Sequence, residues 1–246
     1  MTFVEQNLVV MALILHIETA SPVCSVSLAT DGRVIALRET SEEKAHSSRL
    51  TAMIAELARE AGCELVELNA LSLSMGPGSY TGLRIGTSVA KGMAYGLGIP
   101  VIGIPTLTAL AGGFAAHLRQ AGTDLAASAL LCPMLDARRM EVYTTLFNAN
   151  LEEIRPVEAL ILQEDSFREL LDQQVVWFFG NGSGKANTLI THTNARFDAG
   201  FRLSAAYQAG LAENLFQKQE FLDTAYFEPH YLKEFLATIP KNKIIG

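Results

Sequence analysis

The segment G-P-G-S-Y-T-G-L-R-I-G, which spans Gly76–Gly86, decides how this chain folds. The apolar run 68–74 before it is typical of a buried strand, and the apolar spacing after it indicates a helix over about 81–97. Glycine and proline between two such elements favour a tight turn. The segment therefore predicts a strand, a turn and a helix in direct succession.

The turn carries groups that could bind an anion. Pro77 fixes its own φ, while Gly76 and Gly78 permit backbone angles that other residues avoid. Ser79 or Thr81 can cap the helix, whose first N–H groups are free to hold a negative charge. The spacing does not fit the dinucleotide motif, because the third glycine falls one residue late. Two interpretations stay open: an anion site, or a turn that needs glycine for steric reasons alone.

The helix after the turn has two stripes of apolar residues. Small residues recur every fourth position, at Gly82, Gly86, Ala90 and Ala94. Larger apolar residues recur in the same way at Ile85, Val89 and Met93. Glycine inside a helix costs about 1 kcal/mol relative to alanine, so two helical glycines indicate that another backbone comes close. The pattern leaves open whether both stripes are buried in this chain or one of them meets a partner.

Outward from this segment, the first half of the chain predicts one α/β lobe. The hairpin signal Asp31-Gly32 lies between two apolar runs, and an amphipathic helix stops at Gly62. Strands are expected at 13–18, 24–29, 33–39, 68–74 and 101–104, and helices at about 50–61, 81–97 and 106–120. Three strands followed by alternating helices and strands indicate a β-β-β-α-β-α-β-α lobe.

The pattern restarts after Gly122, which predicts a second lobe. Strands are expected at 129–135, 142–148 and 175–179, helices near 165–172 and 204–218, and a loop at 180–184. The predicted organisation is an unstructured leader at 1–11, a first lobe at 12–122, and a second lobe with a tail at 123–246. The predicted fold class is α/β, with two related lobes whose mixed sheets are flanked by helices.

Composition narrows the classes of function. The 246 residues carry a net charge of −7 and neither half is basic, so strong nucleic-acid binding by this chain alone is not expected. The apolar run 8–17 is too short to span a membrane and lacks the basic residues that precede it in a signal peptide. Three distant cysteines suit a reducing compartment. Met1 and Met11 are both acceptable starts.

The motifs for catalysis are incomplete. The run 180–185 lacks two residues of a P-loop, because Phe179 and Ala186 occupy the positions of its first glycine and its final hydroxyl. The five histidines, His16 among them, are scattered without i, i+4 spacing, and each is expected at the surface or at a helix end. The run 18–21 could hold phosphate and a metal, or be a solvated strand end.

Together these segments resemble the TsaB family. The likeness is carried by I-E-T-A-S-P-V-C-S-V-S-L at 17–28, H-S-S-R-L at 46–50, the Gly76–Gly86 segment, and V-I-G-I-P-T-L-T-A-L at 101–110. Two further segments, D-A-R-R-M-E-V-Y at 136–143 and F-G-N-G-S-G at 179–184, match more loosely. The resemblance covers about residues 12–110 well.

The resemblance implies a bilobal fold of the actin-like and hexokinase-like (ASKHA) class and a cytoplasmic, non-catalytic subunit. TsaB proteins pair with a catalytic relative, TsaD, and an ATPase, TsaE, joins the complex. The complex transfers threonylcarbamoyl to the adenosine next to the anticodon of tRNAs that read codons beginning with adenine. The chain is then expected to form a homodimer when alone and to meet tRNA only through the complex, without membrane contact. Any ATP or ADP would bind weakly at a subunit interface.

The resemblance also assigns residues. TsaD carries H-x-x-x-H for a metal, and Thr106 and Leu110 occupy those positions here, so neither a catalytic residue nor a metal ligand is expected. Partner binding would use helix residues of the first lobe: Leu50, Met53, Ile54, Leu57, Leu83, Val89 and Met93. A vestigial nucleotide or anion site would comprise Glu18, Thr19, Ser21, Ser79 and Thr81. The family more often has aspartate at position 18, which weakens the case for a nucleotide there.

Two enzymatic alternatives remain. A metal-dependent, glycoprotease-like peptidase would need the missing histidine pair. A small-molecule kinase of the same fold would need a general-base aspartate and an intact phosphate loop, and neither can be identified in the sequence.

Overall fold

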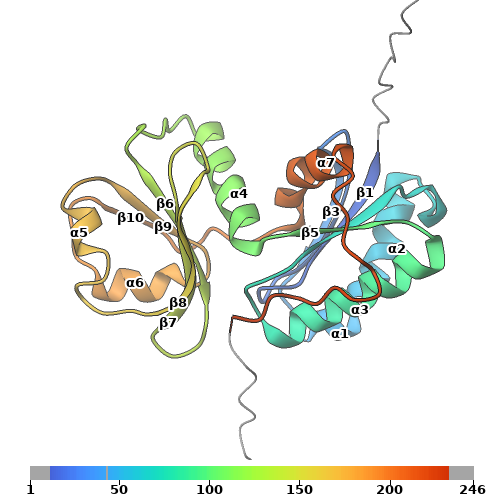
Figure 1. Cartoon of the computed structure of the whole chain (residues 1–246), viewed down its shortest axis with the longest axis horizontal. Helices are drawn as coiled ribbons and strands as arrows, with labels where there is room; N and C mark the ends of the chain where they lie inside the picture. The colour runs from blue at the N-terminus through green and yellow to red at the C-terminus, as the bar shows by residue number, and fades with distance from the viewer. Residues whose placement is uncertain (1–11, 43, 233–246) are drawn as a thin grey trace, which may run out of the picture.

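The computed structural model describes residues 12–42 and 44–232. They form two five-stranded sheets that lie side by side, each with its own helices (Figure 1). The predicted leader at 1–11 falls outside the described residues. The fold is therefore a bilobal α/β fold, as expected from the repeated pattern of strands and helices.

The first lobe has the predicted order of elements. Its sheet has the order β3-β2-β1-β4-β5. The strands are β1 (Leu13–Glu18), β2 (Cys24–Thr30), β3 (Arg33–Thr40), β4 (Ala70–Ser74) and β5 (Val101–Ile104). The helices are α1 (Ala45–Ser48), α2 (Leu50–Ala61), the 3-10 turn η1 (Leu65–Glu67), α3 (Tyr80–Leu97) and α4 (Thr106–Gln120). Strands β1 to β3 form the expected antiparallel meander, and β4 and β5 join in parallel.

The two faces of this sheet differ in polarity. The alternation along β1 sends Leu15 and Ile17 to one face, where they join the core formed with α2 and α3. His16 and Glu18 point to the other face, which is covered by η2 (Ala205–Gln208) and α7 (Ala209–Gln217). Figure 1 shows α7 and α2 on opposite sides of the sheet. One face is thus apolar, while the other carries buried polar side chains.

The second lobe contains more regular structure than the sequence indicated. Its sheet has the order β10-β9-β6-β7-β8. The strands are β6 (Leu130–Asp136), β7 (Glu141–Phe147), β8 (Glu153–Ile161), β9 (Val176–Phe179) and β10 (Ala195–Asp198), and the helices are α5 (Arg168–Leu171) and α6 (Ser183–Leu189). Strands β8 and β10 were not predicted. Both lie at the edges of the sheet and have exposed polar residues, so their apolar alternation is weak.

Three predictions for the second lobe were wrong in detail. The expected loop at 180–184 instead begins helix α6, because Gly180 turns the chain at a φ of 94° and Ser183 starts the helix behind it. The helix expected near 165–172 contracts to four residues. The single helix expected at 204–218 divides into the 3-10 turn η2 and helix α7. Propensity does not separate a 3-10 turn from the helix that follows it.

Helix α4 joins the two lobes. It follows β5 of the first sheet, and its side chains Leu110 and Phe114 are fully buried against the second lobe. The Phe114 ring stacks on Phe179 of β9 at 3.9 Å and meets Phe201 edge-on at 5.1 Å. The lobes are therefore connected by one shared hydrophobic cluster as well as by the chain.

The small residues of α3 lie against the turn that follows β1. A side chain at Gly82 would overlap the carbonyl oxygen of Thr19, and one at Gly86 would overlap the Thr19 hydroxyl. The residue that caps α3 also binds this turn, because Ser79 N donates to Ala20 O at 2.7 Å. The backbone that the helical glycines accommodate therefore belongs to this chain. Among the described helices, none is both long and apolar enough to cross a membrane.

The glycines of α3 provide a matched test of this packing. We expect Gly82→Ala to lower the free energy of unfolding by about 2 kcal/mol or more, because the new methyl group collides with backbone. Gly92 lies in the same helix, and no atom of residues 12–42 and 44–232 lies within 4 Å of the place that a methyl group there would take. Gly92→Ala should therefore raise the free energy of unfolding by about 1 kcal/mol through helix propensity alone. Urea unfolding followed by circular dichroism measures both, and equal effects would contradict the packing.

Candidate functional site

Most of the residues predicted to bind a partner lie in the interior of the chain. Leu50, Met53, Ile54 and Leu57 of α2, together with Leu83 of α3, are at most 3% exposed. Their helical spacing marks the side of α2 that packs on the sheet, and the same periodicity would mark a docking stripe. The prediction that these five residues contact a partner is therefore wrong for this structure. These side chains stabilise α2 and α3 from the buried side of each helix.

Val89 and Met93 are placed differently. Both are partly buried at the edge of the same core, on the side of α3 that approaches solvent. Their assignment as partner-binding residues stays a prediction.

The outward face of α3 is formed mainly by residues that sequence periodicity did not single out. Arg84, Ser88, Gly92 and Tyr95 are exposed at helical spacing, and the Tyr95 side chain is 90% exposed. A shallow cavity of about 550 Å³ runs along the first half of this face, beside Ile85 and Val89. We call Arg84, Ile85, Ser88, Val89 and Gly92 the outer face of α3. Gly92 is exposed on this face, and no atom of the described residues lies within 4 Å of the place that a Cβ there would take.

A second feature is the cleft between the lobes, a cavity of about 510 Å³. Ser21, Ser79 and Thr81 of the predicted anion site line it from the first lobe. Asp136 and Arg138, in the turn between β6 and β7, line it from the second. The structure therefore brings three of the five predicted anion-site residues to one cavity.

The opposing wall of the cleft is held by its own hydrogen bonds. Asp136 Oδ1 accepts from Arg138 N at 2.6 Å and from Lys185 Nζ at 2.9 Å. The backbone N–H of Asp136 donates to Asn181 Oδ1 at 3.1 Å. Arg138 has a φ of 70°, in the left-handed region. The segment 180–184, which lacks the residues of a P-loop, contributes Asn181 to the lining of the cleft.

Glu18 and Thr19 do not line the cleft. Glu18 is fully buried, and its carboxylate accepts hydrogen bonds from Ala20 N at 2.7 Å, from Ser74 Oγ and from Gln208 Nε2. Burial raises the pKa of Glu18 from 4.5 to about 7, although these hydrogen bonds act in the opposite direction. An acid turned inward and satisfied in this way does not face the cleft. Glu18 and Thr19 therefore do not lie in the cleft with the other three residues of the predicted vestigial nucleotide or anion site.

His16 also departs from its predicted place. It is fully buried beside Ser72, whose Oγ lies 2.6 Å from His16 Nδ1, and burial lowers the pKa of His16 from 6.5 to about 3. Ser72 Oγ donates in turn to Gln208 Oε1 at 2.7 Å. Gln208 Nε2 donates to Ile17 O at 3.0 Å, so this one side chain connects the sheet to η2. We call His16, Glu18, Ser72, Ser74 and Gln208 the polar seam.

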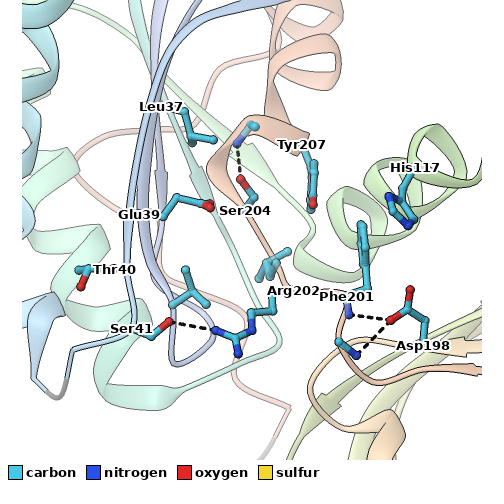
Figure 2. A pocket seen from close by; sticks show the side chains of 14 residues that line it. Leu37, Glu39, Thr40, Ser41, His117, Asp198, Phe201, Arg202, Ser204 and Tyr207 are labelled. Atoms are coloured by element: carbon cyan, nitrogen blue, oxygen red, sulfur yellow. Dashed lines mark hydrogen bonds between the residues drawn. The ribbon is translucent and has the colours of Figure 1, made fainter. Parts of the chain in front are cut away.

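A third cavity, of about 560 Å³, lies where the end of β3, the segment after β10 and the end of α4 meet. Figure 2 shows Glu39, Arg202 and Asp198 around it, with the Tyr207 and His117 rings at its upper side. Asp198 Oδ1 accepts from Gly200 N and Phe201 N, and Arg202 Nη1 donates to Ser41 Oγ at 3.3 Å. The Asp198 contacts are local turn hydrogen bonds, and the Arg202 contact joins the segment after β10 to the end of β3.

Metal-binding geometry is not found in the part of the chain that the structure describes. No group of three histidine, cysteine, aspartate or glutamate side chains converges within residues 12–42 and 44–232. Thr106 and Leu110 are fully buried, and Thr106 Oγ1 accepts from Gly76 N at 3.0 Å. These two side chains therefore fix the glycine turn and the core.

The two sheets, their strand orders and the helix that joins them define the class of protein. The fold is the two-lobed actin-like and hexokinase-like (ASKHA) fold. Two solved structures from Pseudomonas aeruginosa share it over the whole of their chains. One, an uncharacterized protein with similarity to peptidase YEAZ, has a TM-score of 0.76 at 25% identity over 91% of this chain. The other, YeaZ, has a TM-score of 0.73 at 26% identity over 90%.

The family model described as TsaD, tRNA N6-adenosine threonylcarbamoyltransferase, matches residues 34–241, and the chain belongs to this family. Within it, the chain is TsaB/YeaZ-like. TsaB of Escherichia coli is 39% identical over 130 residues, which are 53% of this chain and 52% of the relative. TsaB of Haemophilus influenzae is 35% identical over 170 residues, which are 69% of this chain and 64% of the relative. The matches thus span between half and two thirds of these relatives.

The polar seam predicts an unusual dependence of stability on pH. Between pH 4.5 and 7 the folded protein binds more protons at Glu18 than the unfolded chain does, so this contribution is full below pH 4.5 and lost as the pH rises through 7. His16 acts oppositely, because its lowered pKa removes stability as the pH falls from 6.5 to 3. The two effects oppose each other between pH 4.5 and 6.5.

We expect Glu18→Gln to remove the first effect alone. The free energy of unfolding of the variant minus that of the native chain should rise with pH between 4.5 and 7, by up to about 1.4 kcal/mol per pH unit. Urea unfolding at half-unit steps measures this difference, with the exposed Glu169→Gln as the matched control. A difference that does not change with pH would contradict the raised pKa of Glu18.

Proposed function

We propose that this chain is a non-catalytic subunit in the biosynthesis of threonylcarbamoyladenosine on tRNA. It pairs with a TsaD-like catalytic subunit and is joined by a TsaE-like ATPase. Together they transfer threonylcarbamoyl to the adenosine next to the anticodon of tRNAs that read codons beginning with adenine. The names of the TsaB relatives, which place those proteins in this biosynthesis, support the proposal.

The outer face of α3 is the single observation that carries the partner role. The small stripe of α3 is used inside the chain, where Gly82 and Gly86 pack against Thr19, so the outer face remains for another protein. That face combines half-buried Ile85 and Val89 with an exposed Gly92, over which no side chain stands. An exposed glycine on a helix allows a second helix to approach closely, as small residues do at other helix contacts. The same face would pair two copies of the chain when the partner is absent.

The non-catalytic role is supported by the state of the groups that chemistry would need. Glu18 accepts hydrogen bonds within the polar seam, and the positions of the TsaD metal ligands hold Thr106 and Leu110. The acidic chain, with a net charge of −7, favours contact with tRNA through the complex. We place the complex in the cytoplasm and expect any ATP or ADP to bind weakly near a subunit interface.

Reconstitution tests the proposed role directly. Purified TsaD, TsaE, tRNA and threonylcarbamoyl-adenylate should form modified nucleoside at least about tenfold faster when this chain is added, a margin that corresponds to about 1.4 kcal/mol. Mass spectrometry of digested tRNA measures the product. Equal rates with and without the chain would refute the subunit role.

A second experiment locates the docking face. Gly92→Glu places a charged side chain on the outer face of α3, where nothing in the chain is displaced, and helix propensity favours the change. We expect Gly92→Glu to weaken TsaD binding at least about tenfold, while the free energy of unfolding stays equal to or above that of the native chain. Asn214→Glu, on the exposed side of α7, is the matched control and should bind normally. Unchanged affinity for the Gly92→Glu variant, measured by calorimetry, would place the interface elsewhere.

A further inference from the structure

A cavity of about 420 Å³ lies between α3 and the segment that follows α7. In Figure 1 this segment, drawn in red, runs back from α7 alongside α3. The cavity is lined by Tyr80, Arg84, Thr87, Ser88, Lys91, Phe227, Glu228, Pro229 and Tyr231. It shares no residue with the cavity of Figure 2, and only Tyr80 with the interlobe cleft. It shares Tyr80, Arg84 and Ser88 with the shallow cavity on the outer face of α3, whereas Thr87, Lys91 and the C-terminal segment line this cavity and not that one.

Two cations face this cavity from one helix. Lys91 Nζ donates to Ala225 O at 3.3 Å and lies 4.5 Å from the centre of the Phe227 ring. Arg84, two turns earlier, donates from Nη1 to Tyr80 Oη at 3.0 Å. Neither forms an ion pair with any acidic group in the described part of the chain. Glu228 is the one acidic residue in the lining, so the charged groups sum to +1 in a protein whose net charge is −7.

A buried hydroxyl group also lines this cavity. Thr87 lies between Arg84 and Lys91 along α3, and the residue is only 8% exposed. Its Oγ1 is buried without a hydrogen-bond partner among the described residues. A buried hydroxyl is costly to leave unpaired, so a site that keeps one beside two cations is suited to an acceptor-rich ligand. Oxygen atoms of a phosphate accept from hydroxyl, guanidinium and ammonium donors alike.

Aromatic rings form the remaining wall. The Tyr80 and Tyr231 rings contact each other at 4.7 Å between centroids, at the end of the cavity that is nearer the start of α3. Aromatic side chains beside basic groups are the usual means of holding a nucleotide, with a base against a ring and a phosphate against the cations. The cavity thus offers both kinds of contact.

We propose that the cavity between α3 and the C-terminal segment binds a nucleotide unit, with its phosphate held by Arg84, Lys91 and the Thr87 hydroxyl. The unit is either a free nucleotide or part of a single RNA strand, because both present the same phosphate and base. Arg84 and Ser88 also belong to the outer face of α3, so the proposal is tested on the full-length chain alone, with no partner on that face.

Isothermal titration with four probes tests the ligand class. Adenosine monophosphate should bind, adenosine without phosphate should bind at least about tenfold more weakly, and inorganic phosphate should also be weaker because it lacks the base. An oligoadenylate of six nucleotides distinguishes the sources: tighter binding than the mononucleotide indicates an RNA strand, and equal or weaker binding indicates a free nucleotide. Equal affinity for adenosine and its monophosphate, or no binding by any probe, would overturn the proposal.

Charge variants of opposite sign separate this cavity from the interlobe cleft. We expect Lys91→Gln, which removes a cation, and Thr87→Val, which removes a hydrogen-bond donor, each to weaken binding of the monophosphate about tenfold. Glu228→Gln removes the opposing negative charge and should strengthen binding. Lys218→Gln, an exposed cation at the end of α7, should leave the affinity unchanged. Thr87→Val keeps the shape of the side chain, so thermal unfolding should show an intact fold. Binding lost in Ser79→Ala but retained in the Lys91 and Thr87 variants would assign the ligand to the cleft and overturn the proposal.

Discussion

The contact between α3 and the turn after β1 is the constraint on which the first lobe depends. The helix can lie this close only because Gly82 and Gly86 leave room for the backbone and hydroxyl of Thr19. The resulting packing buries the turn, directs Glu18 inward, and leaves Ser79 and Thr81 at the mouth of the cleft. The turn after β1 could have formed an open phosphate loop, but α3 packs directly against it instead.

The polar seam is the second consequence of that arrangement. Beneath the apolar face that packs on α2 and α3, the opposite face of the sheet carries His16, Glu18, Ser72 and Ser74. Gln208 hydrogen-bonds to both ends of this row, at Ser72 and at Glu18, and to the backbone of β1. Most of these buried polar groups satisfy one another, while His16 Nε2 is buried without a hydrogen-bond partner among the described residues. A network of this kind favours one arrangement of the elements that contribute to it. The seam thus fixes η2 against the first sheet.

Much of the fold could be predicted from the sequence, because strong periodicity coincided with clear turn signals. The order of the first lobe followed from the Asp31-Gly32 hairpin and from Gly62, which ends α2 with a φ of 68°. Edge strands β8 and β10 were missed because exposed strands need no apolar alternation. The candidate site was harder to predict, because a helical apolar stripe marks burial without saying whether the chain itself or a partner provides the cover. Leu50 and Leu57 turned out to be core, while the Gln208 and Asp136 contacts join segments distant along the chain, which no local pattern reveals.

The shared cluster around Phe114 has a consequence for how the molecule can be divided. Since α4 leaves the first sheet and presents Leu110 and Phe114 to the second lobe, each lobe covers apolar surface that the other would expose. A chain cut after α4 would expose Leu110 and Phe114 to water, so each half would lose the cover of part of its apolar surface. The chain also returns to the first sheet through η2 and α7, so a division between the lobes would separate each sheet from a helix that covers it.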